Sequence, residues 1–291
     1  MRLQLIVNPA AGRGRAIRAL AAVQGALAAH DVLVTPTRSL EHADELVAAA
    51  VGDERLPVAF GGDGIVGRVA GAAASLDALM GALPGGRGND FCRSVGIPPD
   101  PVAACAVLDR GIARRLDLGE VQSAIGRRAF VGIASIGFDS DVQERALASR
   151  LPVGRLVYLA ATLASIATWR PATFPCTIDG APLLVHGWSV AVANTGMYGG
   201  GMRLAPNASP SDGRLDVVTT SATSRRSFLA TLPKVFSGTH VHEPTVGLVR
   251  ASIVELDADR PFRVFADGDP VGTLPCMITV RAAAVQVLLP A

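Results

Sequence analysis

Residues 61–64 read Gly-Gly-Asp-Gly and stand between an apolar run, 56–60, and a helix-forming stretch that begins at Ile65. Glycine lets the backbone approach a ligand closely and adopt positive φ. The following helix N-terminus offers unpaired N–H groups and partial positive charge, so the segment is typical of a phosphate-handling turn. The Asp63 carboxylate would repel bare phosphate, but it suits magnesium, bound water or an acceptor hydroxyl. Alternatively, Asp63 is only the N-cap of a tight strand–helix turn.

The first half of the chain alternates predicted strands with predicted helices. Strands are expected at 3–7, 32–35, 56–60 and 78–83, each followed by a helical or turn-forming stretch. Such alternation predicts a parallel sheet flanked by helices. Ligands of such sheets bind at the carboxyl ends of the strands. Four segments lie at those ends, which predicts one shared cleft: 8–12, 35–37, 61–64 and 85–90.

From about residue 116 the pattern changes to strand candidates separated by turns rich in Gly, Pro, Asp and Ser, with one helical insertion over 143–168. This pattern predicts an antiparallel β domain. We therefore expect an α/β N-terminal domain over 1–118 and an antiparallel β-sandwich C-terminal domain over 119–291, whose last strand can return to the first domain. The strand candidates are 128–135, 174–179, 183–194, 214–220, 244–256, 261–266 and 276–289.

Bulk composition narrows the classes of protein. The 291 residues, 49% of them hydrophobic, suffice for one large or two ordinary domains. The formal net charge is +2 with no basic tract, so no nucleic-acid partner is expected. Four widely spaced cysteines predict buried reduced thiols rather than a zinc site or disulfides. No signal peptide is recognised, and the longest apolar stretch, 156–168, is too short to span a bilayer, which favours a cytoplasmic protein.

Five ordered segments carry a family resemblance. They are Asn-Pro-Ala-Ala-Gly at 8–12, Gly-Gly-Asp-Gly at 61–64, Pro-Gly-Gly-Arg-Gly-Asn-Asp-Phe at 84–91, Tyr-Gly-Gly-Gly-Met at 198–202 continuing to 212–216, and Asp-Gly-Asp-Pro at 267–270. Together they resemble the diacylglycerol kinase catalytic family, which includes bacterial lipid kinases and sphingosine kinases. NAD kinases share the first glycine-rich turn and the two-domain plan but lack the 84–91 pattern, so they are the lesser match. The resemblance implies a NAD kinase/diacylglycerol kinase-like fold.

The resemblance also implies an ATP-dependent lipid kinase that transfers the γ-phosphate to a hydroxyl of a diacylglycerol-like lipid. It implies a structural Mg²⁺ site in which the Asp212 carboxylate combines with the backbone carbonyls of Ser209 and Arg214, because hard cations take oxygen ligands. ATP would bind the first domain and the cleft. The implied nucleotide-binding positions are Asn8, Thr37, Gly61, Gly62, Asp63, Gly64, Ile65, Val66, Gly67, Arg87 and Asn89.

The catalytic carboxylates are likewise assigned by resemblance. Asp267-Gly268-Asp269 matches the family's Asp-Gly-Glu, whose third residue accepts the lipid hydroxyl proton, so Asp269 is the expected base, with Asp267 and Asp63 beside it. Phosphoryl transfer needs positioning and charge neutralisation, and a well-placed general base contributes roughly 10²–10⁴-fold. Asp63, Asp90 and Asp117 could hold magnesium-bound water. Without the family argument, the Asp-Gly turn is an equally good signal for a plain hairpin.

Several positions depart from the family pattern. Ile65 replaces a common Thr, Gly67 and Arg68 replace Asn-Glu, Arg87 replaces Thr, and Asp269 replaces Glu. Arg68 and Arg87 could pair bidentately with nucleotide phosphates. They could equally mark a different phosphoryl donor or a weakened enzyme.

The apolar stretch 156–169 is bordered by Arg150, Arg155 and Arg170. It predicts either a helix packed on the β domain or a lip that touches a membrane, where arginines meet anionic lipid. The expected partner is a lipid presented at a membrane surface, and a homodimer is possible. Two alternatives stay open: a same-fold kinase of a soluble substrate, as in NAD kinases, or a non-catalytic nucleotide- or lipid-binding homologue. An apolar tunnel between the domains would favour the lipid kinase, and a polar dinucleotide groove the NAD kinase.

Overall fold

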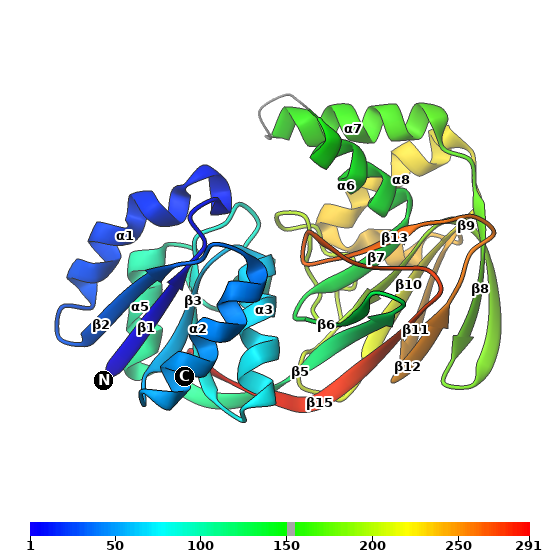
Figure 1. The fold of residues 1–291 in the computed structure, drawn as a ribbon. Helices are drawn as coiled ribbons and strands as arrows, with labels where there is room; N and C mark the ends of the chain where they lie inside the picture. Colours follow the sequence, from blue (N-terminus) through cyan, green and yellow to red (C-terminus); the bar gives the residue numbers. More distant parts are fainter. Residues whose placement is uncertain (150–154) are drawn as a thin grey trace.

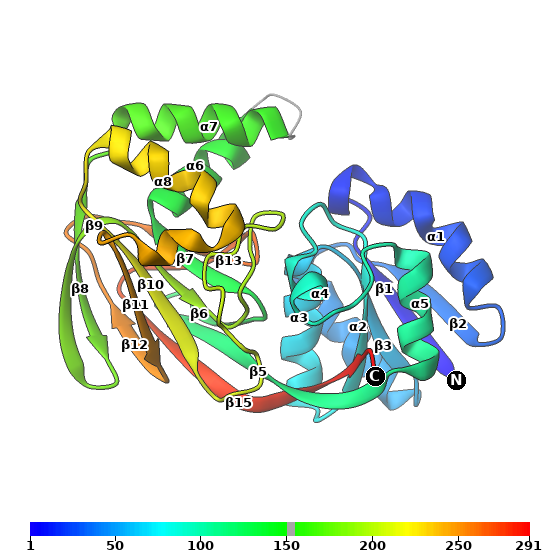
Figure 2. The ribbon, with the colours of Figure 1, turned by 180° about the vertical axis from the view of Figure 1, so that it is seen from behind.

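The first domain is a parallel sheet covered by helices on both faces, as the alternating pattern predicts. The computed structural model describes residues 1–149 and 155–291. The strand order is β2-β1-β3-β4. Helices α1 and α5 cover one face and α2 and α3 the other (Figures 1 and 2). The elements are β1 (Arg2–Val7), α1 (Arg15–Ala26), β2 (Asp31–Pro36), α2 (Leu40–Gly52), β3 (Leu56–Gly61), α3 (Asp63–Ser75), β4 (Leu79–Pro84), α4 (Asp90–Ser94) and α5 (Pro101–Arg110).

Burial and capping explain these elements. Strand β1 buries Leu3, Leu5 and Ile6, because a parallel sheet between two helix layers needs strands that are apolar on both faces. Helix α5 is not among the elements expected from the sequence, yet its start carries the usual signals. Asp100 accepts a hydrogen bond from the Ala103 N–H at 2.8 Å, and Pro101 occupies the first helical position.

The second domain is an antiparallel β-sandwich with three helices, α6, α7 and α8, gathered at one end (Figure 1). Where the sequence predicts one helical insertion over 143–168, the structure has two helices, α6 and α7. Where it predicts one strand over 244–256, the structure has two strands, β11 and β12. Helix α8 is also absent from the sequence expectations, since Pro233 inside it breaks the helical signal. The elements are β6 (Gly126–Phe130), β7 (Ile133–Gly137), α6 (Phe138–Ala148), α7 (Arg155–Thr168), β8 (Ala172–Ile178), β9 (Ala181–Ala193), β10 (Leu215–Ser221), α8 (Arg225–Ser237), β11 (Val246–Ala251), β12 (Ile253–Leu256), β13 (Arg263–Ala266) and β14 (Asp269–Thr273).

A long antiparallel ribbon joins the two domains. It consists of β5 (Ile112–Ser123) and β15 (Cys276–Leu289). Strand β5 runs unbroken through residue 118, so a boundary drawn there falls inside a strand. Strand β15 then enters the first domain, where Gln286 and Val287 pair in parallel with Leu79 and Met80 of β4.

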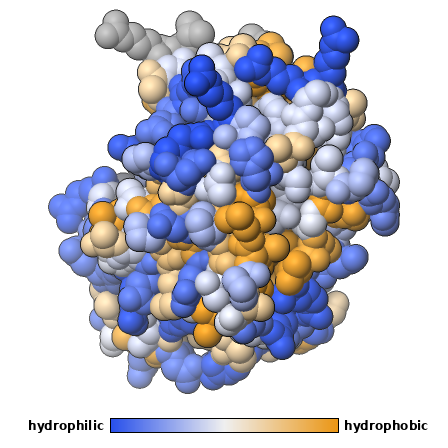
Figure 3. All heavy atoms as spheres, turned by 90° about the vertical axis from the view of Figure 1, so that its right-hand side faces the viewer, coloured by the Kyte–Doolittle hydropathy of each residue, from blue (hydrophilic) through white to orange (hydrophobic). Residues whose placement is uncertain are grey.

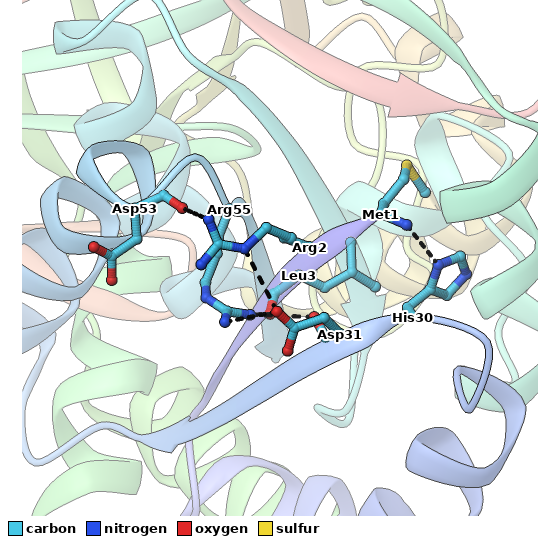
Figure 4. A network of polar contacts seen from close by, with 7 residues as sticks. All are labelled: Met1, Arg2, Leu3, His30, Asp31, Asp53 and Arg55. Atoms are coloured by element: carbon cyan, nitrogen blue, oxygen red, sulfur yellow. Dashed lines mark hydrogen bonds and ion pairs between the residues drawn. The ribbon is translucent and has the colours of Figure 1, made fainter.

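A polar network lies at the amino ends of the strands, at the end of the sheet opposite the glycine-rich turns (Figure 4). Arg55 Nη2 lies 2.8 Å from Asp31 Oδ2, and its Nη1 donates to the carbonyls of Leu3 and Asp31. This arginine lowers the pKa of Asp31 chiefly through the side-chain hydrogen bond. His30 contacts the Met1 amino group and Asp109. The carboxylates of Asp31 and Asp109 are open to solvent, and pairs with a solvent-exposed partner contribute little stability.

The surface of the second domain includes apolar side chains. Figure 3 views the side on which β8 and β9 lie, where apolar residues gather in a patch bordered by polar ones. Leu184 of β9 is 69% exposed. In the described part of the chain, no helix is long and apolar enough to cross a membrane. All four cysteines are free and buried, as expected.

Candidate active site

Three turns of the first domain come into close backbone contact. A Cβ added to Gly86 would lie 2.4 Å from the Gly62 Cα, and one added to Gly12 would lie 2.8 Å from the Gly85 carbonyl oxygen. The Gly85 N–H donates to the Gly61 carbonyl at 2.6 Å. The segments 8–12, 61–64 and 85–90 therefore meet at the carboxyl ends of β1, β3 and β4, where the sequence predicts a cleft.

Three predicted nucleotide-binding side chains shape these loops. Asn8 Oδ1 accepts from the Ala10 N–H at 3.0 Å, and the Thr37 hydroxyl donates to the Val7 carbonyl. Asn89 has a left-handed backbone (φ 50°), and its Oδ1 accepts from the Gly86 N–H at 2.7 Å. Each side chain holds the local backbone, so contacts with nucleotide at these positions stay a prediction.

The turn at 61–64 starts helix α3. Gly62, not Asp63, is the N-cap, so the N-cap interpretation of Asp63 is wrong. The φ of Gly62 is −95°, and a Cβ added there would lie 3.4 Å from the Gly86 Cα, an ordinary contact, so the close approach of these two turns requires glycine at Gly86 rather than at Gly62. Asp63 Oδ1 instead accepts from the Phe91 N–H at 2.9 Å, which ties the turn to α4. Ile65 is buried and packs over Gly61.

The turn between β13 and β14 crosses from the second domain onto helix α3. A Cβ added to Gly64 would lie 2.0 Å from Asp269 Oδ2, and one added to Gly67 would lie 2.5 Å from Asp267 Oδ2. The absence of side chains at these glycines therefore makes room for both carboxylates. The structure brings all three predicted catalytic residues, Asp63, Asp267 and Asp269, to the same end of α3. Val66 is buried in that helix.

Asp267 is fixed from the second domain by two backbone donors. Its Oδ2 accepts from the Val131 N–H at 2.9 Å and its Oδ1 from the Gly132 N–H at 2.8 Å. Sequence reasoning missed these two donors, because backbone N–H groups leave no residue pattern. With both oxygens held by the scaffold, Asp267 is suited to positioning the turn that carries Asp269.

Burial dominates the electrostatics of the carboxylates. It raises the pKa of Asp63 and of Asp269 above the ordinary value. Burial also raises the pKa of Asp267 to about 8, against the lowering effect of the Val131 and Gly132 N–H groups. Asp90 is buried with a raised pKa, and its Oδ2 accepts from the Gly200 N–H at 2.8 Å. A carboxylate with a raised pKa can take a proton from a hydroxyl, and a group of them attracts a divalent cation.

The predicted metal residues fit a bound ion poorly. Asp212 Oδ1 accepts from the Arg214 N–H at 3.0 Å, and its Oδ2 is paired with Arg250. An ion would have to compete with this guanidinium for the Asp212 carboxylate. Among the described residues, no group of three or more His, Cys, Asp or Glu side chains is arranged to hold a metal. Ligation by Asp212, Ser209 and Arg214 stays a prediction.

Asp117 and the two arginines have distinct surroundings. Asp117 accepts from the N–H groups of Gly213 and Ala283 at 2.7 Å each, so it clamps the ribbon between the domains. Arg68 forms a bidentate pair with Asp44 of α2, in which Nε lies 2.6 Å from Oδ1. To pair with nucleotide phosphates, one of the two possibilities open from the sequence, Arg68 would have to leave Asp44. Arg87 is exposed on the loop before α4.

Two cavities open elsewhere on the second domain. One, of about 510 Å³, lies between α6, the end of α7 and residues 260–262. The other, of about 620 Å³, lies between β8, β12 and the start of β15. Neither is lined by residues of the first domain, so neither is the tunnel between domains that would favour a lipid acceptor.

Comparisons with known proteins give one consistent family. Residues 2–121 match the diacylglycerol kinase catalytic domain, and residues 132–289 match the YegS C-terminal NAD kinase beta sandwich-like domain. A protein of Mycobacterium tuberculosis named diacylglycerol kinase is 37% identical over 98% of this chain and 94% of its own length. A "Probable lipid kinase YegS-like" of Pseudomonas fluorescens is 33% identical over 89% of this chain and 86% of its own.

A solved structure supports the fold. The crystal structure of a diacylglycerol kinase from Bacillus anthracis superimposes with a TM-score of 0.73 at 20% identity, covering 99% of this chain and 96% of that one. At that identity the likeness concerns the fold, and it confirms the expected two-domain architecture.

Proposed function

The chain belongs to the diacylglycerol kinase catalytic family and is a lipid kinase, and we propose that it transfers the γ-phosphate of ATP to a hydroxyl of a diacylglycerol-like lipid. The observation that carries this proposal is the approach of Asp269 to Gly64. It sets a half-buried carboxylate directly opposite the glycine-rich turn at the start of α3.

The phosphates of ATP would lie at this turn. The N-terminus of α3 supplies unpaired N–H groups and partial positive charge, and the glycines allow close approach. Asp269 would accept the proton of the lipid hydroxyl as that oxygen attacks the γ-phosphorus, the bond from the γ-phosphorus to the bridging oxygen breaks, and ADP leaves. The raised pKa of Asp269 supports this role, because a base with a higher pKa takes the proton more readily. Asp267 would hold the turn in place.

Magnesium would accompany the nucleotide, held by Asp63 and Asp90. This pair fits a hard cation better than Asp212 does. Asp90 Oδ1 is buried without a hydrogen-bond partner. A Cβ added to Gly88 would lie 2.7 Å from Asp90 Oδ2 and 3.2 Å from Asp63 Oδ2, so the two carboxylates lie close together beside this glycine. When bound, the ion neutralises phosphate charge.

The lipid would be taken from a membrane surface by a cytoplasmic enzyme in peripheral contact with it. Helix α7 exposes Tyr158 and Leu163, and Leu147 of α6 is exposed beside it. Arg170 follows the helix and can meet anionic headgroups. Arg150 of the predicted basic border lies outside the described residues, and no side-chain placement is described for Arg155.

A homodimer is also part of the proposal. In the described sheet β11 pairs only with β10, and it exposes Leu248 and Val249, so its free edge could pair with a second copy. Light scattering of the purified protein would test this.

The activity is tested by incubating the protein with radiolabelled ATP, magnesium and a panel of lipids in mixed micelles, with NAD as a soluble acceptor. We expect label in the chloroform phase with diacylglycerol and none in NAD. Labelled NAD would refute the lipid acceptor. ATP binding without transfer to any acceptor would instead support a non-catalytic homologue.

A further inference from the structure

The side chain of Asn194 joins two segments that lie far apart in the chain. Asn194 follows strand β9 directly and is fully buried. Its Nδ2 donates to the carbonyl oxygen of Asp117 at 3.0 Å and to that of Val131 at 2.9 Å. A carbonyl oxygen can only accept a hydrogen bond, so both contacts require the amide nitrogen on this side.

The first of the two segments is the ribbon between the domains. Asp117 belongs to β5, and its N–H donates to the Pro210 carbonyl at 2.7 Å. Its carboxylate accepts from the N–H groups of Gly213 and Ala283. Backbone and side chain of Asp117 are thus both held, so its carbonyl gives Asn194 a fixed support on the ribbon.

The second segment carries the donors that hold Asp267. The N–H groups of Val131 and Gly132 donate to the Asp267 carboxylate at 2.9 and 2.8 Å. Asn194 binds this segment twice, because its side chain donates to the Val131 carbonyl and its own N–H donates to the Gly132 carbonyl at 2.9 Å. Asn194 therefore fixes the backbone that fixes Asp267.

Asp267 in turn sets the place of the proposed base. Asp267 and Asp269 lie two residues apart, and Asp267 has a left-handed backbone (φ 54°) in the turn between β13 and β14. This turn brings Asp269 Oδ2 to 2.0 Å from a Cβ added at Gly64. A shift of residues 131–132 would therefore move Asp269 relative to the glycine-rich turn at 61–64.

We propose that Asn194 is a positioning residue for phosphoryl transfer: its amide ties the Val131 and Gly132 donors to the ribbon between the domains and so holds the turn with Asp267 and Asp269 against residues 61–64. The inference rests on the proposed kinase activity. It assigns to Asn194 no contact with either substrate.

The first test removes the two side-chain donors. Asn194→Asp keeps the shape of the side chain but sets an oxygen against the two carbonyls, and Asn194→Ala removes the polar group. Both variants should lower kcat about tenfold, less than the roughly 10²-fold expected for a displacement of about 1 Å. The Kd of ATP should stay within about twofold, because the first domain supplies the proposed nucleotide contacts. Full kcat in either folded variant would overturn the proposal.

Val185→Ala is the matched control for lost stability. Val185 lies in the same strand β9, is 5% exposed, and stands nine residues before Asn194, roughly 30 Å away along the strand. Truncation of either buried side chain should lower the midpoint of thermal unfolding. Only the Asn194 variants should lower kcat at temperatures well below that midpoint. An equal loss of kcat in Val185→Ala would refute a positioning role.

Two further variants test the route through Asp267. Gly132→Ala leaves Asn194 intact, but its Cβ would lie 2.6 Å from Asp267 Oδ1, so it should lower kcat by displacing Asp267 even where the Asn194 variants do not fold. Full kcat in Gly132→Ala would refute the route. In Asp267→Asn, one of the two N–H groups loses its acceptor, and the added change Asn194→Ala should cost less than about twofold in kcat. Losses that multiply in this double variant would also refute the route.

Hydrogen–deuterium exchange without lipid gives a readout that does not depend on activity. Peptides covering 129–134 and 264–269 should exchange faster in Asn194→Ala and Asn194→Asp than in wild type and Val185→Ala. If the wild type phosphorylates no lipid but this exchange pattern holds, the proposed function fails and the linkage stands. Unchanged exchange of these peptides in the Asn194 variants would refute the linkage.

Discussion

The contact between Gly64 and Asp269 predicts an unusual alanine substitution. Gly64 lies in the first turn of α3, where alanine should favour the helix by about 0.5–1 kcal/mol over glycine. A methyl group there would nevertheless come to 2.0 Å from Asp269 Oδ2. Gly64→Ala should therefore fold at least as well as wild type while it displaces the proposed base.

The size of the effect follows from the geometry. Carbon and oxygen need a separation of about 3.3 Å, so the Asp269 carboxylate must move by more than about 1 Å. A misplacement of about 1 Å costs roughly 10²-fold in turnover. We expect kcat of Gly64→Ala to fall about 10²-fold, with the Kd of ATP within about threefold of wild type.

The assay combines initial rates of lipid phosphorylation, calorimetric ATP titration and thermal unfolding. Gly25→Ala is the matched control: it makes the same change in helix α1, where nothing lies within 4 Å of the added Cβ. It should gain stability without losing activity. Turnover of Gly64→Ala within about threefold of wild type would refute the placement of the base. Loss of ATP affinity instead of turnover would mean that the methyl group occupies the phosphate site.

Four further outcomes are expected. Asp269→Asn should lose about 10²-fold in kcat at unchanged ATP affinity by calorimetry, and turnover within about threefold of wild type would contradict its role as base. Gly62→Val should abolish ATP binding in a folded protein, because a Cβ added at Gly62 already contacts the Gly86 Cα at 3.4 Å and the two γ-methyl groups of valine would crowd the space beside both turns. Unchanged affinity would exclude this turn as the phosphate site. Arg68→Ala should lower the free energy of unfolding by about 1 kcal/mol in urea titrations without changing the Kd of ATP, since the guanidinium pairs with Asp44 of helix α2. Weaker ATP binding by this variant would show that Arg68 contacts the nucleotide. Burial raises the pKa of Asp139 from 3.8 to about 6, so the stability that its protonated form contributes is complete below pH 3.8 and is lost as the pH rises through 6. Between these pH values, the unfolding free energy of wild type should fall relative to that of Asp139→Asn. Parallel curves for the two proteins would disprove the shift.

Much of the fold could be predicted because it depends on local patterns. Apolar runs with glycine-rich turns at their ends identify the parallel sheet and the cleft at 8–12, 61–64 and 85–90. The ordered family segments add the second domain. Helix α5 lay outside the expectation despite its Asp100 cap, and α8 escaped because Pro233 interrupts its pattern.

The details of the site depend on contacts between residues far apart in the chain. In the sequence, Gly67 and Arg68 suggest a change of charge beside the nucleotide. In the fold, Gly67 makes room for Asp267, and Arg68 turns away to Asp44. Likewise, no spacing in the sequence relates Gly200 to Asp90, since their hydrogen bond depends on how the two domains are placed.

The return of β15 to the first domain also affects how the protein is made. Strand β4 has β3 on one side and residues 286–287 on the other, and about 200 residues lie between β4 and that partner. At ribosomal rates of roughly 5–20 residues per second, the edge of β4 would wait about 10–40 s during synthesis. An uncovered edge strand is a template for wrong pairing. The first domain therefore cannot complete its sheet until the second has been synthesised, and a chain interrupted before residue 286 would leave that edge open to aggregation.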